Sequence, residues 1–351
     1  MLRIAIIQRF LPSRSRGGVG HFAHGLAQAL VANGHQVTVF SEDPAPEGAT
    51  YQVRVVPAIG GRLSPLGFPF ALRRCDFRNF DVVHAQGDEQ WLRRRGRAPV
   101  VRTMHGTSLA EAWFNGVRAG SVKRFVLHLY FYAMELIADL RATRVVGISS
   151  GTARYYPRMH AIVPNGIDLS RFAEAAARNA KSARPSIVFV GELNSRKRGL
   201  WLVDVFSREV RSQVPDAELW VVSPDRLKHV PDGVVLLGTL TDTDLAARIA
   251  QAWVLCLPSA YEGFGRPYAE AMAARTVAAS TRNPGADDVL DGGRAGVLTD
   301  DRLLGAALVG ILNNSAERER LVEIGAVRVA PYSWPRVAAS YEAVYAAAMS
   351  A

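Results

Sequence analysis

Short apolar runs rich in β-branched residues alternate with stretches of helical periodicity along the chain. In the first half, the runs at residues 3–8, 36–40, 51–56, 81–85, 100–104 and 144–148 predict strands. Apolar runs of this kind are typical of parallel strands, which helices cover on both faces of a sheet. Residues 19–32 have apolar positions at helical spacing, and Asn33 and Gly34 supply a C-terminal cap. The first half therefore predicts a doubly wound α/β domain.

The same pattern starts again after residue 185, with strands predicted at residues 187–190, 218–222, 234–237, 254–257, 277–279 and 296–298. A chain of 351 residues is long enough for two domains. We expect one Rossmann-like domain over residues 1–170, a second over residues 185–330, and a closing helix within residues 331–351. Residues 173–185, rich in Ala, Arg, Asn and Ser, are predicted to connect the domains. Two such domains predict a central cleft at the carboxyl ends of both sheets.

Charge and cysteine content limit the partners and the compartment. The formal net charge is +10, with cationic clusters at residues 73–74, 93–97 and 123–124. This balance reflects either a genome that favours arginine codons or a negatively charged partner, such as nucleotide phosphates or an anionic membrane. No cluster interleaves with stacking aromatics, so nucleic acid is not expected as a partner. Two distant cysteines, no signal-peptide pattern and no membrane-length apolar run predict a cytoplasmic protein, with peripheral contact at the inner face of the membrane left open.

The most specific feature is a pair of glutamates with a glycine loop between them. Glu262 begins the segment Glu-Gly-Phe-Gly-Arg-Pro-Tyr-Ala-Glu, and Glu270 ends it. The backbone N–H groups of Gly263, Phe264 and Gly265, followed by a proline-opened helix, suit the binding of hydroxyls or phosphates. Glu270, expected in the first helical turn, can accept hydrogen bonds from a ribose diol, and Glu262 can contact a sugar hydroxyl or a developing positive charge. The competing interpretation is a solvated loop residue at 262 and a dipole-favoured glutamate at 270.

This segment resembles the EX7E signature of the retaining glycosyltransferases of family 4, which have the GT-B fold. The resemblance continues, in motif order, through most of the chain. It covers the glycine loop at Gly17 and Gly18 with the helix and strand after it, His105 after a predicted strand, the sequence PNGID at residues 164–168, the donor loop at residues 189–199, and the segment at residues 237–240.

The resemblance implies a retaining glycosyltransferase that moves a hexose-type sugar from a nucleotide sugar to a hydroxyl of a glycan, glycolipid or small glycoside. It implies that Glu262 and His105 act in catalysis, Glu262 by orienting the donor sugar and His105 by contacting sugar or acceptor. Gly17 and Gly18 are assigned to donor binding. The second domain is expected to hold most of the donor and the first the acceptor, with the closing helix returning to the first domain. No metal or other cofactor is expected.

Arg196, Lys197 and Arg198 form a cationic cluster after a predicted strand. Cations there can stabilise the charge that grows on a leaving diphosphate, although an arginine-rich loop can also be simply solvated. The family commonly has arginine after the loop glycine, where this chain has Glu192. We therefore assign phosphate binding to Arg196 and Lys197, and expect Arg198 to face a helix start or solvent.

Residues 18–23 also fit the pattern GxGxxA, with Glu42 near the position of a ribose-binding acid. The alternative function is therefore an NAD(P)- or FAD-dependent oxidoreductase. That fingerprint requires its first glycine at the very end of the strand, whereas residues 9–16 intervene here. Asp242 and Asp244 spell the metal motif DxD, but Thr241 or Asp242 is better interpreted as the N-cap of a helix.

Residues 125–140 predict a helix that is apolar on most of its circumference and follows Lys123 and Arg124. A helix of this kind is usually buried against a sheet, and we expect that here. The alternative is contact with a lipid-linked acceptor or with the membrane interface.

Overall fold

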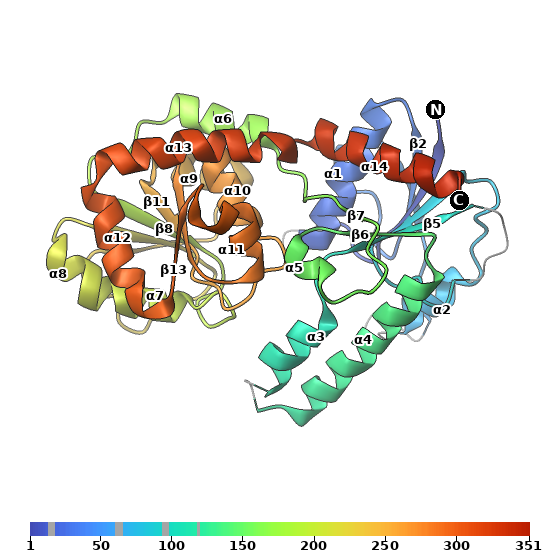
Figure 1. Ribbon diagram of the computed structural model, residues 1–351, viewed down its shortest axis with the longest axis horizontal. Coiled ribbons are helices and arrows are strands. Elements are labelled where there is room, and N and C mark those ends of the chain that lie inside the picture. Colours follow the sequence, from blue (N-terminus) through green and yellow to red (C-terminus); the bar gives the residue numbers. More distant parts are fainter. Residues whose placement is uncertain (13–17, 60–65, 93–97, 118–119) are drawn as a thin grey trace. The chain divides into compact units, whose positions relative to one another are not determined.

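The computed structural model describes residues 1–12, 18–59, 66–92, 98–117 and 120–351 (Figure 1). The chain divides into two compact units: Met1–Gly166 with Trp334–Ala351 form unit 1, and Ile167–Ser333 form unit 2. Each unit contains one sheet, and all strand pairings described in both sheets are parallel. The structure confirms two doubly wound α/β units in tandem.

Unit 1 contains a seven-stranded sheet in the order β3-β2-β1-β4-β5-β6-β7. Its strands are β1 (Arg3–Ile7), β2 (Gln36–Ser41), β3 (Gln52–Val55), β4 (Val82–Ala85), β5 (Val100–Met104), β6 (Arg144–Gly147) and β7 (Ala161–Ile162). Its helices are α1 (Gly18–Ala32), α2 (Gly67–Leu72), α3 (Ser108–Glu111), the π-helical turn η1 (Ala112–Val117), α4 (Val122–Arg141), α5 (Ser150–Ala153) and α14 (Trp334–Met349). The predicted strands are confirmed with small shifts at their ends, and the short strand β7 was not predicted.

Both faces of the unit 1 sheet are covered, and β1 shows how. Ile4 and Ile6 join a buried cluster with residues of α1 and α14, whereas Ala5 and Ile7 join a second cluster with residues of α2. Alternate residues of a strand point to opposite faces, so both faces of β1 meet apolar side chains. This double burial explains why the strand is apolar throughout.

Helix α14 belongs to unit 1 although it ends the chain. It packs against α1, and its Tyr341 and Tyr345 are fully buried. The indole of Trp334, its first residue, occupies space left by two glycines. A Cβ at Gly25 of α1 would lie 2.1 Å from Trp334 Cζ2, and a Cβ at Gly166 would lie 2.2 Å from Trp334 Cε3. The glycine of the sequence PNGID is therefore required by close packing against this indole.

Unit 2 contains a six-stranded sheet in the order β10-β9-β8-β11-β12-β13. Its strands are β8 (Ser186–Val190), β9 (Glu218–Val222), β10 (Val234–Gly238), β11 (Val254–Cys256), β12 (Val277–Thr281) and β13 (Val297–Thr299). Its helices are α6 (Leu169–Arg178), α7 (Gly199–Val205), α8 (Arg211–Gln213), α9 (Asp242–Gln251), α10 (Arg266–Ala273), α11 (Pro284–Val289), α12 (Leu304–Asn313) and α13 (Ser315–Val329), with π- or 3₁₀-helical turns η2 (Phe206–Val210), η3 (Asp291–Gly293), η4 (Asp301–Leu303) and η5 (Ala330–Tyr332).

The connection predicted at residues 173–185 is wrong over its first part, because α6 runs to Arg178 as part of unit 2. The carboxylate of Asp168 caps this helix by accepting a hydrogen bond from the backbone N–H of Arg171 at 3.1 Å. Phe172 is its buried anchor. The chain instead passes between the units at Gly166–Ile167 and Ser333–Trp334. The Ile167 N–H donates to the Tyr332 carbonyl at 2.8 Å, so the ends of unit 2 lie side by side.

Helix α4 contradicts the expectation of burial against the sheet. Of its residues only Ala138 and Asp139 are buried. Together with α3 and η1 it forms a helical hairpin that projects from the sheet of unit 1 (Figure 1). Within the described part of the chain, no helix combines the length and apolar character needed to cross a membrane.

Candidate active site

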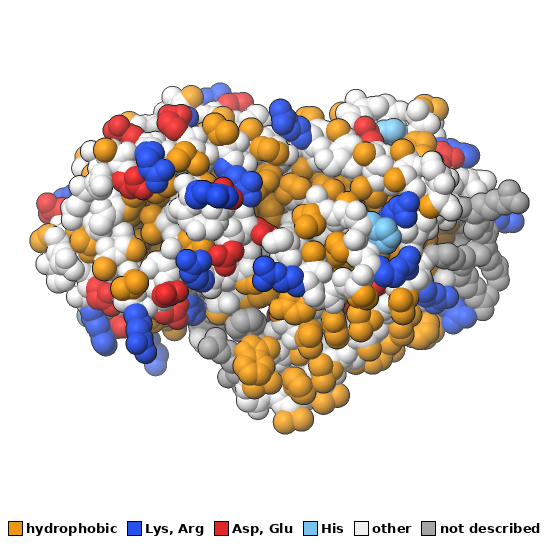
Figure 2. All heavy atoms as spheres, in the orientation of Figure 1, with side chains coloured by type: hydrophobic (Ala, Val, Ile, Leu, Met, Phe, Trp, Pro, Cys, Tyr) orange, Lys and Arg blue, Asp and Glu red, His pale blue; other side chains and the backbone are white. Residues whose placement is uncertain are grey.

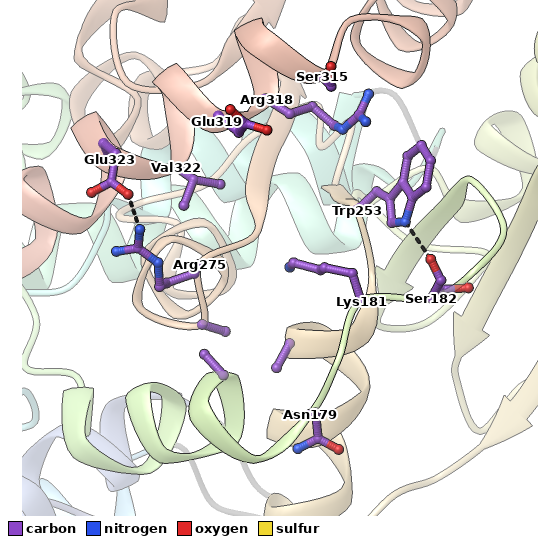
Figure 3. Close-up of a pocket in the computed structure, with 13 residues that line it drawn as sticks. Asn179, Lys181, Ser182, Trp253, Arg275, Ser315, Arg318, Glu319, Val322 and Glu323 are labelled. Carbon is purple, nitrogen blue, oxygen red and sulfur yellow. Dashed lines mark hydrogen bonds and ion pairs between the residues drawn. The ribbon is translucent and has the colours of Figure 1, made fainter.

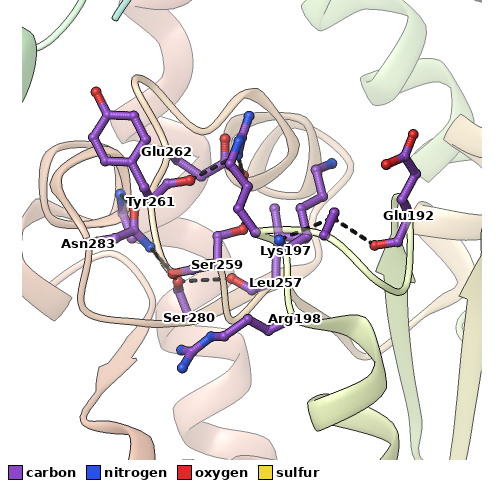
Figure 4. A network of polar contacts seen from close by, with 12 residues as sticks. Glu192, Lys197, Arg198, Leu257, Ser259, Tyr261, Glu262, Ser280 and Asn283 are labelled. Atoms are coloured by element: carbon purple, nitrogen blue, oxygen red, sulfur yellow. Dashed lines mark hydrogen bonds and ion pairs between the residues drawn. The ribbon is translucent and has the colours of Figure 1, made fainter. Parts of the chain in front are cut away.

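The strand order of unit 2 changes direction at β8 and β11, which are neighbours in the sheet. The carboxyl ends of such a strand pair flank the crevice in which open α/β sheets bind ligands. Residues 191–198 follow β8, and residues 257–265 follow β11. A backbone hydrogen bond of 2.8 Å from Ala260 N to Arg196 O joins the two loops. The structure therefore brings the predicted donor loop and the glutamate segment to one place (Figure 4).

Lys197 lies across the start of the donor loop. Gly191 has φ +140°, and a Cβ there would lie 2.4 Å from Lys197 Cδ. The ammonium donates a hydrogen bond of 3.0 Å to the carbonyl of Val190, the last residue of β8. Burial lowers the pKa of Lys197, while the carboxylates of Glu262, Glu270 and Glu192 act to raise it and Arg196 to lower it. The charged groups of the two loops therefore act together on the partly buried ammonium of Lys197.

Glu262 is buried and held from two sides. Its Oε1 accepts a hydrogen bond of 2.9 Å from Ser259 Oγ and forms an ion pair of 2.8 Å with Arg196 Nη1. The same guanidinium nitrogen donates to the Tyr261 carbonyl at 2.9 Å. Asn283 donates to the Ser259 carbonyl at 3.1 Å, which fixes the turn beneath the glutamate (Figure 4). Ser259 and Asn283 were not predicted, because neither belongs to the glutamate segment.

Arg198 is tied into the fold. It is the N-cap residue of α7, with φ +57°. Its guanidinium donates to the Pro258 carbonyl at 2.6 Å and to Thr281 Oγ1 at 2.6 Å, and pairs with Asp301 at 2.6 Å. It also lies over the Trp201 ring at 4.3 Å. The expected position at a helix start is confirmed, and its donors are engaged by protein groups.

The glycine loop leads into α10 through a left-handed residue. Gly265 is the N-cap with φ +88°, and a Cβ there would lie 2.5 Å from the Tyr268 ring. Gly263 precedes Phe264, whose ring packs edge-on against Tyr332 at 5.4 Å. The side chain of Phe264 is therefore buried in the fold, and its backbone is what the loop can offer a ligand.

Glu270 lies in the second turn of α10, so its expected place in the first turn is wrong. The helix begins at Arg266, one turn before Glu270. Arg266 Nη2 lies 3.3 Å from Glu270 Oε1. This i,i+4 pair aligns the carboxylate along the helix surface. The negative charge of the Glu270 carboxylate acts to raise the pKa of Lys197.

On unit 1, His105 follows β5 and heads a chain of buried polar contacts. His105 Nε2 lies 2.6 Å from Gln86 Oε1, and Gln86 Nε2 lies 3.1 Å from His84 Nε2. His84 Nδ1 lies 2.7 Å from the Tyr345 hydroxyl of α14. Burial lowers the pKa of both histidines to about 3, and the nearby Arg102 guanidinium adds to the effect on His105. Both imidazoles are therefore neutral at neutral pH.

Two residues after β4 were missed by the sequence analysis. Gln86 orients His105, and Asp88 lies beyond it with φ +67°. Burial raises the pKa of Asp88 to about 6. Because β4 and β1 are neighbours at which the strand order of unit 1 reverses, these residues lie at the ligand-binding edge of that sheet. A polar segment directly after a buried apolar strand is the signal that could have found them.

The glycine loop of unit 1 is only partly visible. Gly17 lies outside the described residues, and Gly18 is the first residue of α1. A Cβ at Gly18 would meet no atom within 4 Å, whereas at Gly20 it would lie 2.7 Å from the Phe10 carbonyl oxygen. Gly18 therefore has no packing reason to be glycine, and its assignment to donor binding stays a prediction.

The DxD motif is an N-terminal helix cap. Thr241 is the N-cap of α9 and accepts a hydrogen bond from Asp244 N at 3.2 Å. Asp242 pairs with Arg171 at 2.8 Å. Among the residues that the structure describes, no group of three or more His, Cys, Asp or Glu side chains could hold a metal. The independence of metal stays a prediction.

A separate cavity of about 480 Å³ lies in unit 2 (Figure 3). Lys181, Trp253 and Arg275 line it, and they precede β8, β11 and β12, so it lies at the amino ends of these strands. Lys181 Nζ donates to Ala252 O and Thr276 Oγ1, both at 2.8 Å, and Arg275 pairs with Glu323. Lys181 and Arg275 therefore have protein partners. The cavity lies at the edge of the sheet opposite the donor loop.

Comparison with known families and proteins gives one consistent result. Residues 16–171 match the family described as Glycosyltransferase Family 4, and residues 184–314 match that described as Glycosyl transferases group 1. The phosphatidyl-myo-inositol mannosyltransferase of Mycobacterium leprae is 27% identical over 361 residues, covering 94% of this chain and 92% of that protein. The MMP alpha-(1->4)-mannosyltransferase of Mycolicibacterium hassiacum is 27% identical over 420 residues, covering 99% of each.

Solved structures share the fold. Sucrose-phosphate synthase from Thermosynechococcus elongatus superposes with a TM-score of 0.82 at 21% identity, covering 100% of both chains. Anabaena HepE, in complex with UDP and glucose, superposes with a TM-score of 0.72 at 15% identity, covering 99% of this chain and 100% of that one. None of these relatives supports the oxidoreductase alternative. With Glycosyltransferase Family 4 matched in the first half, Glycosyl transferases group 1 in the second and relatives along nearly its whole length, the chain is a nucleotide-sugar-dependent glycosyltransferase of the GT-B fold, of the family 4/group 1 type.

Proposed function

We propose that the chain is a retaining hexosyltransferase whose unit 2 binds the nucleotide sugar and whose unit 1 binds the hydroxyl acceptor. The observation that carries the donor assignment is the Lys197 ammonium at the end of β8, with the charges of Arg196, Glu262 and Glu270 around it. The names of two relatives, both mannosyltransferases, support a hexose as the transferred group.

Arg196 and Lys197 hold the diphosphate in this proposal. A nucleoside diphosphate gains negative charge as the bond to the sugar stretches, and preplaced cations stabilise that charge more than they stabilise the ground state. Lys197 uses one of its N–H groups on Val190 and has two others to offer. The ion pair with Glu262 aligns the Arg196 guanidinium before the donor arrives.

The two glutamates take different parts of the donor. Glu262, whose Oε1 is fixed by Ser259 and Arg196, orients the sugar through its hydroxyls. Glu270 accepts hydrogen bonds from the ribose diol, and the backbone of Gly263, Phe264 and Gly265 faces the donor. Gly17 and Gly18 contact the donor from the loop of unit 1.

His105 acts as a neutral imidazole towards sugar or acceptor. Burial lowers the pKa of His105 to about 3, so the ring carries one proton at neutral pH. Since an amide oxygen only accepts, the proton lies on Nε2, which donates a hydrogen bond of 2.6 Å to Gln86 Oε1. Nδ1 then carries a lone pair that can accept a hydrogen bond from a hydroxyl. Gln86 is thus a positioning residue that selects the tautomer.

The configuration of the sugar is retained by attack from the face that the diphosphate leaves. The departing phosphate takes the proton of the acceptor hydroxyl, and no metal takes part. The acceptor is a hydroxyl of a glycan, glycolipid or small glycoside. The cationic first half supports peripheral contact with an anionic membrane as part of the proposal.

Thermal denaturation with UDP, GDP, ADP and dTDP, each with and without its sugar, identifies the donor. A ligand at about 100 times its Kd adds about 2.7 kcal/mol of stability. NMR of the product then gives the anomeric configuration. We expect stabilisation by one nucleoside diphosphate and a product with the configuration of the donor. An inverted product, or protection by NADH alone, would refute the proposal.

A further inference from the structure

Helix α4 turns its apolar stripe outward. Val122, Val126, Leu129, Tyr130 and Leu140 follow helical spacing and are all exposed, Val122 at 76% and Val126 at 58% of their surface. A surface helix ordinarily packs such a stripe on the core and turns its charges to water. Helix α4 packs Tyr132 and Leu136 on the core and, in addition, exposes this second apolar stripe.

The acidic side chains of α4 face inward. Glu135 accepts hydrogen bonds of 2.6 Å from Ser108 Oγ and 2.8 Å from the Tyr156 hydroxyl. Asp139 is fully buried, and burial raises its pKa. Glu135 and Asp139 are the only carboxylates in the sequence of α4. The outward face is therefore apolar without negative charge.

The apolar surface continues onto the neighbouring turn of the hairpin. Trp113 and Val117 of η1 are exposed, Trp113 at 54%. Figure 2 shows hydrophobic side chains gathered over the hairpin of α3, η1 and α4, at the lower edge of the view. A contiguous exposed apolar surface of this kind marks a binding face for a membrane or another macromolecule.

Cations flank the stripe where α4 begins. Lys123 is exposed at the side of the stripe, Arg124 is exposed in the same first turn with a long side chain that can reach round the helix end, and Arg141 is exposed at the other end. A second copy of the same face would bring no acidic side chain of α4 to these cations. An anionic lipid surface supplies both an apolar layer and negative charge, and Trp and Tyr side chains favour that boundary.

We infer that the outward face of the α3–α4 hairpin docks on an anionic lipid membrane, with α4 lying in the interface plane. Val122, Val126 and Trp113 enter the boundary between headgroups and acyl chains, while Lys123 and Arg124 contact lipid phosphates. The inference deepens the membrane contact in the proposed function. Its test needs no catalysis.

Vesicle flotation tests the inference with the full chain and vesicles of phosphatidylcholine, with or without phosphatidylglycerol. The double substitution V122Q/V126Q removes two apolar contacts and keeps good helix formers, so the fold should survive. Val327 of α13, exposed at 76%, provides the matched control V327Q in unit 2. The double substitution K123Q/R124Q removes the charge.

We expect binding to vesicles that contain phosphatidylglycerol, retained in V327Q and weakened at least about ten-fold in V122Q/V126Q. K123Q/R124Q should weaken binding to the anionic vesicles about five-fold per cation, because each contributes about 1 kcal/mol near an anionic surface. Wild-type-like binding by V122Q/V126Q would overturn the inference. So would a wild type that binds no vesicle but forms a dimer that V122Q/V126Q dissolves. Protection by a nucleoside diphosphate, measured in parallel, shows separately whether the donor site holds.

Discussion

Replacing Lys197 with methionine should abolish most turnover while the fold survives. The ammonium lies at the end of β8, 3.0 Å from the Val190 carbonyl, beside Arg196 and Glu262. Methionine keeps an unbranched apolar stem of similar reach and removes the charge. Loss of one preplaced donor to a developing anion costs about 3–4 kcal/mol, which is about 10²–10³ in turnover.

The same substitution should change stability little. It removes one hydrogen bond, with a net contribution of about 1 kcal/mol. The lowered pKa of Lys197 shows that burial disfavours its charged form, so removing the charge offsets part of that loss. We expect the Tm of unit 2 to move by no more than about 2–4 °C.

Arg198 is the matched control, because it is the next cation in the loop and its donors serve the fold. R198M removes hydrogen bonds to Pro258 and Thr281, and a half-exposed pair with Asp301. We expect a loss of about 2 kcal/mol in stability, with near-normal turnover per folded molecule. Initial rates at saturating donor and thermal denaturation are measured on the same preparations. The reasoning is refuted if K197M keeps more than about a third of wild-type turnover, or if R198M is the slower enzyme.

Four further substitutions test other parts of the structure. E270A should weaken nucleoside diphosphate binding several-fold in calorimetry and leave kcat nearly unchanged, because a ribose contact acts equally in ground and transition states; unchanged affinity would contradict the ribose role. E192R, which restores the base common in the family, should tighten the same binding a few-fold at low salt, and weaker binding would show that residue 192 does not face the diphosphate. G25V should lose about 1–3 kcal/mol of stability by denaturant unfolding, since even a Cβ there would lie 2.1 Å from the Trp334 ring; a neutral result would mean that the indole can move aside. Burial lowers the pKa of His84 to about 3, so below about pH 6.5 the unfolded chain binds a proton that the folded chain excludes. His84 should therefore lower stability by about 1.4 kcal/mol per pH unit as the pH falls from 6.5 to 3, and His105, whose pKa is lowered equally, should add a similar loss, so H84Q should remove about half of the combined slope.

Most strands were predictable because burial on both faces makes them apolar runs, as in β4 and β5, whereas β3 and β10 are partly exposed. Helix α6 was not predicted, because most of its residues are polar or small and only Phe172 is buried against the fold. Helix α4 shows a different limit. Its residues predict a helix that is apolar on most of its circumference, so the sequence does not indicate which face meets the protein. The inward contacts of Glu135 with Ser108 and Tyr156 decide that, and they join residues distant in sequence.

The candidate site was predictable where its residues form a motif. Arg196, Lys197 and Glu262 come together because parallel neighbours β8 and β11 end at the same edge of the sheet. Gln86 belongs to no motif, and its role depends on a contact with His105 across neighbouring strands. The sequence does not distinguish the three consecutive cations Arg196, Lys197 and Arg198. In the structure the left-handed backbone of Arg198 directs its side chain away from the other two.

The structure of the protein with the nucleoside diphosphate of its donor tests the central claim most directly. We expect diphosphate oxygens within about 3 Å of Lys197 Nζ and of the Arg196 guanidinium, with the ribose hydroxyls at Glu270. A diphosphate held by Arg198, or one bound away from the loops that follow β8 and β11, would contradict the account.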